Sequence, residues 1–434
     1  MSGVPNDRPL AVEYVKLSDL RLDPNNPRTH SKKQVAQIAA SMREFGVVNP
    51  ILVTEHLEVI AGHGRVLAVG VLEHDFVPVI RLYGLSAAQK KQLRIADNKI
   101  ALNASWDAAL LRQEILELQA LEVEIDFTVM GFEPAEVDLM LTPKGEDTAE
   151  DDHLPEPPAT PRAQTGDIWQ LGKHRIGCGD SRDEAFVRRV VGDDAVVDAV
   201  FVDPPYNVSI QSHANVRSEH KEFAMASGEM TDSIFIRFLE VTLGVCAAVS
   251  RDGAVHFVCM DWRHMEHLLR AGEVVYDELI NLCVWNKSNA GMGSLYRSKH
   301  ELVFVYRAGA AQHQNNVELG KHGRNRTNVW DYSSVNVGGS RGAELKWHPT
   351  VKPAAMVAAA IQDVTCRGDL VLDTFLGSGT TLIATERTGR VCRGVEIDPA
   401  YVDIAIERWE AITGKTAERV DSAGGYGAGR EAAA

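Results

Sequence analysis

Apolar runs and helical patterns alternate along the second half of the chain. Five runs have the length and composition of buried strands, and they span 197–202, 254–259, 302–306, 370–374 and 391–397. Segments such as 234–249 and 356–364 lie between them and repeat apolar residues at helical spacing. Strands with continuous apolar runs are buried on both faces, so this order predicts a mostly parallel, doubly wound α/β sheet.

The first third of the chain has a shorter pattern. Residues 13–16 and 51–54 have strand character, and 32–45 carries apolar residues at helical spacing that ends before Gly46. A further helix is predicted over 106–120. These elements predict a small α+β domain within residues 1–141.

An acidic, proline-rich segment separates the two patterns. Residues 142–163 contain almost no large apolar side chains, so they cannot bury enough surface to offset their chain entropy. We expect a solvated linker here and a larger domain over 164–414. Residues 415–434 are expected to form a disordered tail.

Composition restricts the class of protein. No apolar run is long enough to span a bilayer, and the N-terminus lacks the apolar core of a signal peptide. The six cysteines form no Cys-x-x-Cys pair, which argues against a zinc site or a disulfide framework. We expect a cytoplasmic protein with no membrane partner and no metal.

Charge is distributed unevenly along the chain. The formal net charge is −15, but residues 287–346 carry nine Lys or Arg against four acidic residues. Such a stripe can supply phosphate contacts to nucleic acid. A solvated basic face has the same composition, so charge alone leaves both interpretations open.

Asp203-Pro204-Pro205-Tyr206 directly follows the strand at 197–202. A proline pair cannot continue a central strand, so the chain turns at the carboxyl end, where open parallel sheets bind ligands. Asp203 and the Pro204 carbonyl can accept the two hydrogens of an exocyclic amine, while Tyr206 stacks on a flipped base. An ordinary Asp-Pro turn is the alternative. His300-Glu301 is a candidate for orienting the loop beside the base.

A second motif follows near the C-terminus. The strand at 370–374 leads into Gly377-Ser378-Gly379, a helix begins near Thr380, and the next strand carries Glu396. Glycines let a ligand approach the backbone, and Glu396 can accept both ribose hydroxyls. The turn lacks the lysine of a phosphate-binding loop, which favours a nucleoside that needs no phosphate cradle, such as S-adenosylmethionine. A helix-cap turn in a structural crossover is the alternative. Thr350 and Lys352 precede this unit and could hold the cofactor's carboxylate.

Together these residues resemble the beta class of amino-methylating DNA methyltransferases, over about 165–414. In that family the Asp-Pro-Pro-Tyr motif precedes the cofactor motif, so the resemblance implies a Rossmann-like sheet with permuted motif order, S-adenosylmethionine and double-stranded DNA. It also implies a target-recognition segment at 308–346. The implied cofactor residues are Asp180, Thr350, Lys352, Pro353, Asp373, Phe375, Gly377, Ser378, Gly379, Thr380 and Glu396.

The N-terminal part, about 13–105, resembles the N-terminal domain of ParB-like partition proteins, a fold shared with sulfiredoxin. The matching residues are Asn26-Pro27-Arg28, Gly62-His63-Gly64-Arg65 and Asp97-Asn98. His63 and Gly64 replace a Glu and an Arg of the family's phosphate-binding turn, which speaks against nucleotide hydrolysis. The resemblance still implies a nucleotide or DNA contact through Arg28 and 62–65; a glycine turn with a surface arginine is the alternative.

These features lead to one function and its alternatives. The leading prediction is methyl transfer to adenine N6, because Asp before the proline pair is commoner among adenine enzymes. The alternatives are N4-cytosine methylation and a ParB-like nucleotide- or DNA-binding protein with an inactive methylase half. The sequence leaves open a restriction-modification partner and a homodimer.

Overall fold

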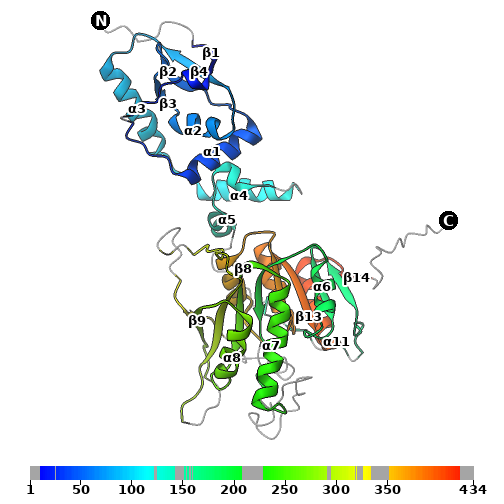
Figure 1. The fold of residues 1–434 in the computed structure, drawn as a ribbon. Coiled ribbons are helices and arrows are strands. Elements are labelled where there is room, and N and C mark those ends of the chain that lie inside the picture. The colour runs from blue at the N-terminus through cyan, green and yellow to red at the C-terminus, as the bar shows by residue number, and fades with distance from the viewer. Residues whose placement is uncertain are drawn as a thin grey trace, which may run out of the picture. The chain divides into compact units, whose positions relative to one another are not determined.

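The computed structural model describes residues 10–420 except 25, 122–124, 142–150, 153, 156–157, 159, 208–227, 291–294, 318, 320–325 and 334–350. The chain divides into two compact units, Met1–Leu141 and Thr142–Ala434 (Figure 1). This division agrees with the expected domain boundary after residue 141. None of the described helices is long and apolar enough to cross a membrane.

The first unit is built on a four-stranded mixed sheet in the order β1-β4-β2-β3. Its strands are β1 (Val12–Lys16), β2 (Ile51–Thr54), β3 (Val59–Ala61) and β4 (Phe76–Leu82). The helices are η1 (Leu17–Asp19), α1 (Lys32–Phe45), α2 (His63–Val71) and α3 (Ala87–Ala101). Apolar residues of α1 and α2, among them Met42 and Val69, form one core with the strands. The expected α+β domain is therefore present, and α1 ends before Gly46 as predicted.

Three further helices follow within this unit, namely α4 (Ala108–Ala120), η2 (Phe127–Met130) and α5 (Pro134–Leu141). They have a small core of their own, formed by Ile115, Val137 and Leu141. The sequence analysis predicted α4 but not the helices behind it.

The second unit is a ten-stranded sheet in the order β11-β9-β10-β8-β7-β12-β13-β6-β5-β14. The strands are β5 (Ile168–Leu171), β6 (His174–Cys178), β7 (Val197–Val202), β8 (Ser250–Met260), β9 (Glu278–Asn286), β10 (His300–Ala308), β11 (Val329–Asp331), β12 (Leu370–Asp373), β13 (Val391–Glu396) and β14 (Glu418–Val420). Strands β8, β7, β12, β13 and β6 are parallel; the first four correspond to predicted runs, whereas β6 was not predicted.

The flanking strands differ from the prediction. β10 pairs antiparallel with β8 and β9, and β5 pairs antiparallel with β6 and β14. The sheet is therefore mixed: β5–β6 and β9–β10 are consecutive antiparallel strands, whereas β8 with β10 and β5 with β14 pair antiparallel without being consecutive. Strand β14 also gives residues 418–420 a fixed place, so the expected disordered tail is wrong for them; 421–434 lie outside the described residues.

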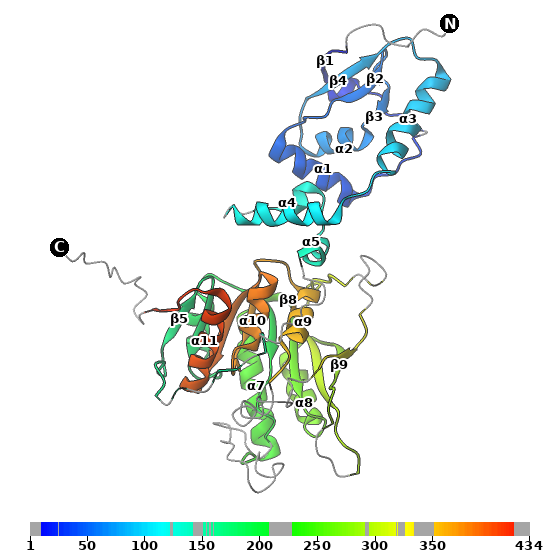
Figure 2. The same ribbon diagram turned by 180° about the vertical axis from the view of Figure 1, so that it is seen from behind.

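Helices cover both faces of this sheet. On one face α6 (Glu184–Val191), α7 (Asp232–Ala248) and α8 (Met265–Val275) form a core with residues such as Val200 and Phe304 (Figure 1). On the other face lie α9 (Ala354–Val364), α10 (Thr380–Thr388) and α11 (Pro399–Thr413), seen from behind in Figure 2. This is the doubly wound arrangement that the sequence predicted.

The end of the expected linker is bound to the second unit. Asp151 accepts hydrogen bonds from Arg387 on α10, at 2.6 and 2.9 Å, and its carbonyl accepts one from Arg408 on α11 at 2.6 Å. Asp152 accepts from the Ala354 N–H at 3.0 Å, and Leu154 is buried. The expectation of a solvated linker is therefore wrong for Asp151, Asp152 and Leu154, because charge-assisted hydrogen bonds offset the entropy of ordering this part of the chain. We call Asp151–Asp152 the acidic strap.

The strap predicts a stability effect. Asp152→Ala removes the acceptor from the first N–H of α9, and we expect the free energy of unfolding to fall by about 1 kcal/mol, as for a lost helix cap. Urea unfolding of the full chain measures it, with Asp194→Ala as an exposed acidic control in the same unit. Equal stability of the two variants would show that the strap contact contributes nothing.

Candidate active site

Asp203 and Tyr206 lie on the turn that follows β7. Strands β8 and β12 flank β7 on both sides, which fixes where the turn begins. The Tyr206 hydroxyl donates a hydrogen bond to Asp203 Oδ1 at 2.6 Å. Asn207 has a φ of 54° and joins Met230 through two hydrogen bonds, at 2.8 and 3.2 Å. The corner is thus held by the strand below it and by the chain that returns into α7.

A chain of four charged side chains extends from this corner. Lys352 donates to Asp203 Oδ2 and lies 3.0 Å from Glu301 Oε2. Lys287 donates in turn to the other oxygen of Glu301. Lys352 and Glu301 are 5% and 8% exposed. We call the set Asp203, Lys352, Glu301 and Lys287 the ion chain.

Burial and charge act against each other in the ion chain. Burial alone would raise the pKa of Glu301, but the ammonium groups of Lys352 and Lys287 outweigh it and lower this pKa to about 2. Burial raises the pKa of Asp203; Lys352 opposes that shift and Glu301 adds to it. Burial would lower the pKa of Lys352, yet the two carboxylates raise it well above its ordinary value. Two anions and two cations thus neutralise one another.

The glycine turn lies beside this corner, because β12 is the neighbour of β7. Asp373 ends β12; its carboxylate accepts from the Phe375 N–H at 2.9 Å and from the Thr381 hydroxyl at 2.6 Å. Burial raises the pKa of Asp373 to about 7. Gly379 has a φ of 87°, and a Cβ there would lie 2.8 Å from the Cβ of Ala405 on α11. Only glycine gives this conformation together with this close packing.

Two acidic residues complete the edge of the site. Glu396 ends β13 and accepts from the Gly377 N–H at 2.8 Å and from the Asp398 N–H at 2.9 Å. Asp180 follows β6 and pairs with Arg182 at 2.6 Å, and this hydrogen bond lowers its pKa. The ends of β7, β12, β13 and β6 therefore bring together the described residues predicted from both motifs. Thr350 lies outside the described residues.

Comparison with known proteins identifies this arrangement. Residues 197–407 match the N6/N4 family described as DNA methylase. Residues 6–98 match the ParB N-terminal domain, and 109–165 match the ParB-methyltransferase HTH domain. The chain is an N6/N4-type DNA methylase with a ParB-like N-terminal domain. The HTH match includes α4 and α5 and the whole expected linker, so sequence analysis missed this domain.

Individual relatives agree with the two parts of the methylase. The chain is 48% identical over 83 residues to the ParB-like nuclease domain-containing protein YnaK of Escherichia coli, covering 19% of this chain and 95% of YnaK. It is 22% identical over 229 residues to the type II methyltransferase M.HpaI of Haemophilus parainfluenzae, covering 50% and 68%. A structural match to PvuII DNA methyltransferase, described as cytosine-N4-specific, has 17% identity, coverage of 60% and 94%, and a TM-score of 0.44.

The predicted phosphate turn of the ParB-like domain begins α2. Gly62 has a φ of 102°, and His63 is buried with no partner for Nε2 among the described residues. Burial lowers the pKa of His63, and the nearby Arg94 and His30 add to the shift. Arg65 does not point to a free anion site, because its guanidinium donates to the carbonyls of Asn49 and Pro50. The Arg28 guanidinium donates a hydrogen bond to the Asn98 side-chain oxygen at 3.2 Å.

The first described part of the predicted recognition segment, residues 308–317, lies away from the corner. Ala308 pairs with Ala254 near the start of β8, and Asn316 donates to the carbonyls of Gln362 and Thr365 at the end of α9. Asp203 follows Val202, whose partner lies near the end of β8. Residues 308–317 therefore do not face Asp203. DNA recognition by 308–346 stays a prediction; 318, 320–325 and 334–346 lie outside the described residues.

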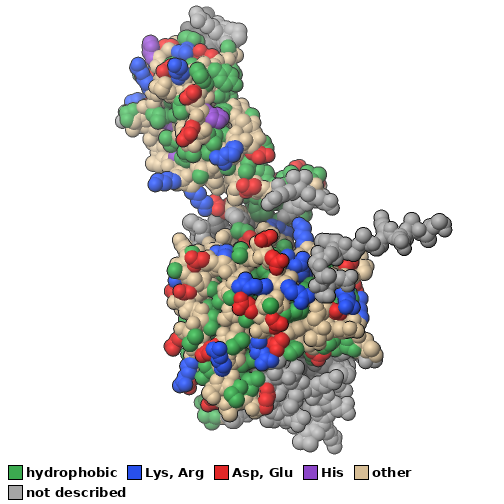
Figure 3. Space-filling view, turned by 45° about the vertical axis from the view of Figure 1, so that its right-hand side comes forward, with side chains coloured by type: hydrophobic (Ala, Val, Ile, Leu, Met, Phe, Trp, Pro, Cys, Tyr) green, Lys and Arg blue, Asp and Glu red, His purple; other side chains and the backbone are tan. Residues whose placement is uncertain are grey.

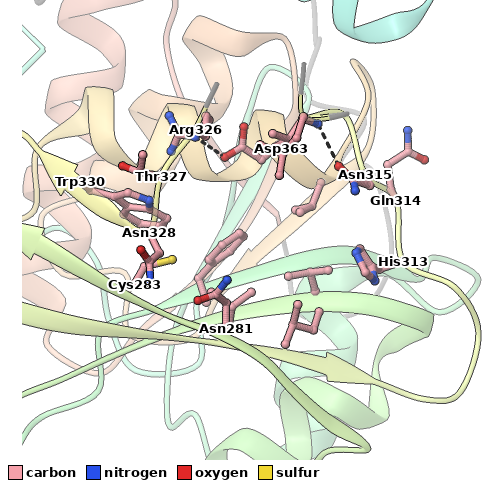
Figure 4. A pocket seen from close by; sticks show the side chains of 17 residues that line it. Asn281, Cys283, His313, Gln314, Asn315, Arg326, Thr327, Asn328, Trp330 and Asp363 are labelled. Carbon is pink, nitrogen blue, oxygen red and sulfur yellow. Dashed lines mark hydrogen bonds and ion pairs between the residues drawn. The ribbon is translucent and has the colours of Figure 1, made fainter. Parts of the chain in front are cut away.

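A separate pocket of about 250 Å³ opens beside this segment (Figure 4). Phe257 and Trp330 contribute to its apolar lining, and Asn281, His313 and Arg326 are among its polar groups. Arg326 is already bound, because it pairs with Asp363 at 2.7 Å. Asp203 and Tyr206 are not among the residues that line it, so the pocket is distinct from the Asp203 corner.

The predicted basic stripe is interrupted by ion pairs. Lys287 pairs with Glu301, Arg307 with Glu278 at 3.2 Å, and Arg326 with Asp363. On the face shown in Figure 3, basic and acidic side chains likewise alternate. Of the described members, Arg297 and Lys299 are exposed, while Lys321, Arg324, Arg341 and Lys346 lie outside the described residues.

Sequence analysis missed the partners within the ion chain. Lys352 was expected to bind a carboxylate of the cofactor, but in the structure it contacts Asp203, 149 residues away in sequence. Glu301 was expected to orient a loop, but it holds two lysines. Lys287 was counted only as part of the basic stripe. No spacing rule connects these positions, because different strands bring them together.

The ion chain predicts a pH-dependent loss of stability. Lys352→Met leaves the buried Glu301 and the partly buried Asp203 with one lysine, and we expect a loss of about 3–5 kcal/mol near pH 8. The loss should be smaller near about pH 5, because burial and Glu301 raise the pKa of Asp203 and a raised carboxyl pKa costs stability only as pH rises. Guanidinium unfolding at both pH values measures this.

Two further variants complete this test. Lys173→Met is the control, because Lys173 is exposed in the same unit. Glu301→Gln added to Lys352→Met should recover part of the loss near the higher pH. An equal loss at both pH values would contradict the charge argument.

Proposed function

We propose that the methylase transfers a methyl group from S-adenosylmethionine to the N6 amino group of adenine in double-stranded DNA. The observation that carries the proposal is the Asp203 corner lying next to the glycine turn at the ends of neighbouring strands. Ligands of open α/β sheets bind at this edge. The nucleobase and the cofactor would therefore meet there.

The described residues fit such a cofactor. Gly377 and Gly379 leave the backbone open to close approach, and the Glu396 carboxylate stands beside the Gly377 N–H, where ribose hydroxyls can donate to it. Asp180 lies after the neighbouring strand β6, where it would face the adenine of the cofactor. Pro353 caps α9 next to Lys352. When bound, the cofactor supplies an electrophilic methyl group.

The chain's own residues would prepare the amine. The lone pair of an exocyclic amine is delocalised into the ring, which makes it a poor nucleophile. Asp203 and the Pro204 carbonyl can accept its two hydrogens and favour a geometry in which the lone pair is free. Tyr206 offers a face for the flipped base. The amine loses one proton on methylation, and the raised pKa of Asp203 makes this carboxylate a suitable acceptor.

This proposal predicts the effect of removing the carboxylate. Asp203→Ala should lower methyl transfer by roughly 100-fold or more, as expected for loss of a proton acceptor and positioning group. The measurement is incorporation of labelled methyl groups into unmethylated genomic DNA, with cofactor binding followed by calorimetry. Asp194→Ala is the exposed control. Unchanged transfer by Asp203→Ala would refute the assignment.

The same assay decides which base is modified. Methylated DNA is digested to nucleosides and the products are identified by mass spectrometry. We expect N6-methyladenine. Detection of N4-methylcytosine instead would support methyl transfer to an exocyclic amine but would show that cytosine is the substrate base.

We also propose that the ParB-like domain binds a nucleotide phosphate at the start of α2. The supporting observation is the buried Nε2 of His63, which lies beside the helix N-terminus together with Arg94. The neutral imidazole can donate to a phosphate oxygen. Arg65 would act indirectly, by fixing the loop before β2.

Titration of the full chain with CTP and ATP tests this second proposal. We expect binding that His63→Ala weakens by about tenfold, the value of one hydrogen bond to a charged group. His56→Ala, on the turn between β2 and β3, serves as the control. Absence of binding by the wild-type chain would remove the proposal.

A further inference from the structure

Lys352 is bound to the Asp203 carboxylate, which is the group that the proposed function needs to accept the base amine. Both oxygens of Asp203 are occupied, Oδ1 by the Tyr206 hydroxyl at 2.6 Å and Oδ2 by the Lys352 ammonium. Each oxygen already accepts from one donor, so a base amine that donates to Asp203 competes with Tyr206 and Lys352 for the same carboxylate. Lys352 is buried, so it cannot exchange Asp203 for water at low cost.

Glu301 offers Lys352 a second carboxylate within reach. Its Oε2 lies 3.0 Å from Lys352 Nζ, so a small movement strengthens this contact while the contact to Asp203 weakens. The Tyr206 hydroxyl also lies 3.4 Å from Oε2. Both donors that occupy Asp203 therefore have the same alternative acceptor.

We propose that Glu301 is a positioning residue that takes over Lys352 when the base amine binds Asp203, with Lys287 setting how strongly it does so. This inference rests on the proposed methyl transfer. Lys287 competes with Lys352 for Glu301, because it donates to Oε1 of the same carboxylate. Glu301 touches neither base nor cofactor in this scheme.

Other groups around Asp203 contribute to its charge state. Those that face it are Tyr206 on the same turn, Lys352 before α9, Glu301 on β10, Cys259 on β8 and Asp373 on β12, with Lys287 behind Glu301. Glu301 is the carboxylate among them that shares Lys352 with Asp203. Removing the charge of Glu301 should therefore shift the pKa of Asp203 in a direction that follows from these contacts.

The two partners of Lys352 predict opposite shifts in the pH dependence of methyl transfer. In Glu301→Gln, Asp203 loses a neighbouring anion and keeps Lys352, so its pKa falls and the acidic limb of the single-turnover rate moves to lower pH. In Lys287→Met, Glu301 attracts Lys352 more strongly, so the pKa of Asp203 rises and the limb moves to higher pH. A role in folding alone would lower the active fraction without moving either limb.

The experiment measures single-turnover methylation of unmethylated genomic DNA across pH for the wild-type chain and both variants. We expect the plateau rate of Glu301→Gln to fall about tenfold or more, as for other positioning groups around a proton acceptor. Its affinity for S-adenosylmethionine should stay within about twofold, because Glu301 does not contact the glycine turn.

Glu278→Gln is the matched control. It removes a carboxylate from the neighbouring strand β9, which breaks a pair with Arg307 at the other end of β10. Its rate and pH profile should match those of the wild-type chain.

The outcomes separate this inference from the proposed function. Methyl transfer by the wild-type chain supports the function whatever the variants do. Wild-type behaviour of Glu301→Gln, or limbs that stay in place in both variants, would overturn the inference and leave the function intact. Should Glu301→Gln fail to fold, Lys287→Met decides, because Lys287 is partly exposed and its predicted shift to higher pH stands by itself.

Discussion

The neutralisation of the buried Glu301 and the partly buried Asp203 by two lysines is the constraint on which the active-site edge depends. Burial at the corner penalises the charge of Asp203. The remedy comes from three other segments, which supply Lys352, Glu301 and Lys287. The corner after β7, the end of β9, the start of β10 and the approach to α9 are therefore held together by charge as well as by packing. A change at one of these segments alters the charge state of the others.

At the glycine turn, backbone N–H groups take the place that the lysines have in the ion chain, because they donate hydrogen bonds to buried carboxylates. Carboxylates of Asp373 and Glu396 accept N–H groups of the turn, which holds its backbone without filling the space beside it. From the other side, Arg408 donates to the Ser378 carbonyl and to the carbonyl of Asp151 in the acidic strap. The strap belongs to the stretch that matches the HTH domain. The polypeptide leaving that domain is thereby part of the support of the glycine turn.

Local features of this structure could be predicted from sequence, and long-range pairings could not. The proline corner and the turn at 377–379 depend on residues a few positions apart, so backbone restrictions alone indicated them. The direction of β10 was missed, because an apolar run does not reveal whether a hairpin or a helix precedes it. The strap was misread for a similar reason. Its acidic residues suggested solvation, and only the folded structure shows that Arg387 and Arg408 donate hydrogen bonds to Asp151.

In the proposed mechanism the corner binds an exocyclic amine and not a particular ring, which separates the chemistry from the choice of base. Adenine and cytosine would present the same pair of hydrogens to Asp203 and to the Pro204 carbonyl, and Tyr206 could stack on either. The ion chain would likewise respond to whether an amine is bound to Asp203, whatever ring carries it. Discrimination between the bases therefore requires groups outside 203–206 that reach the ring edge. Such groups can change in evolution without disturbing Lys352, Glu301 and Lys287, so one charge arrangement can serve enzymes with different bases and different DNA sequences.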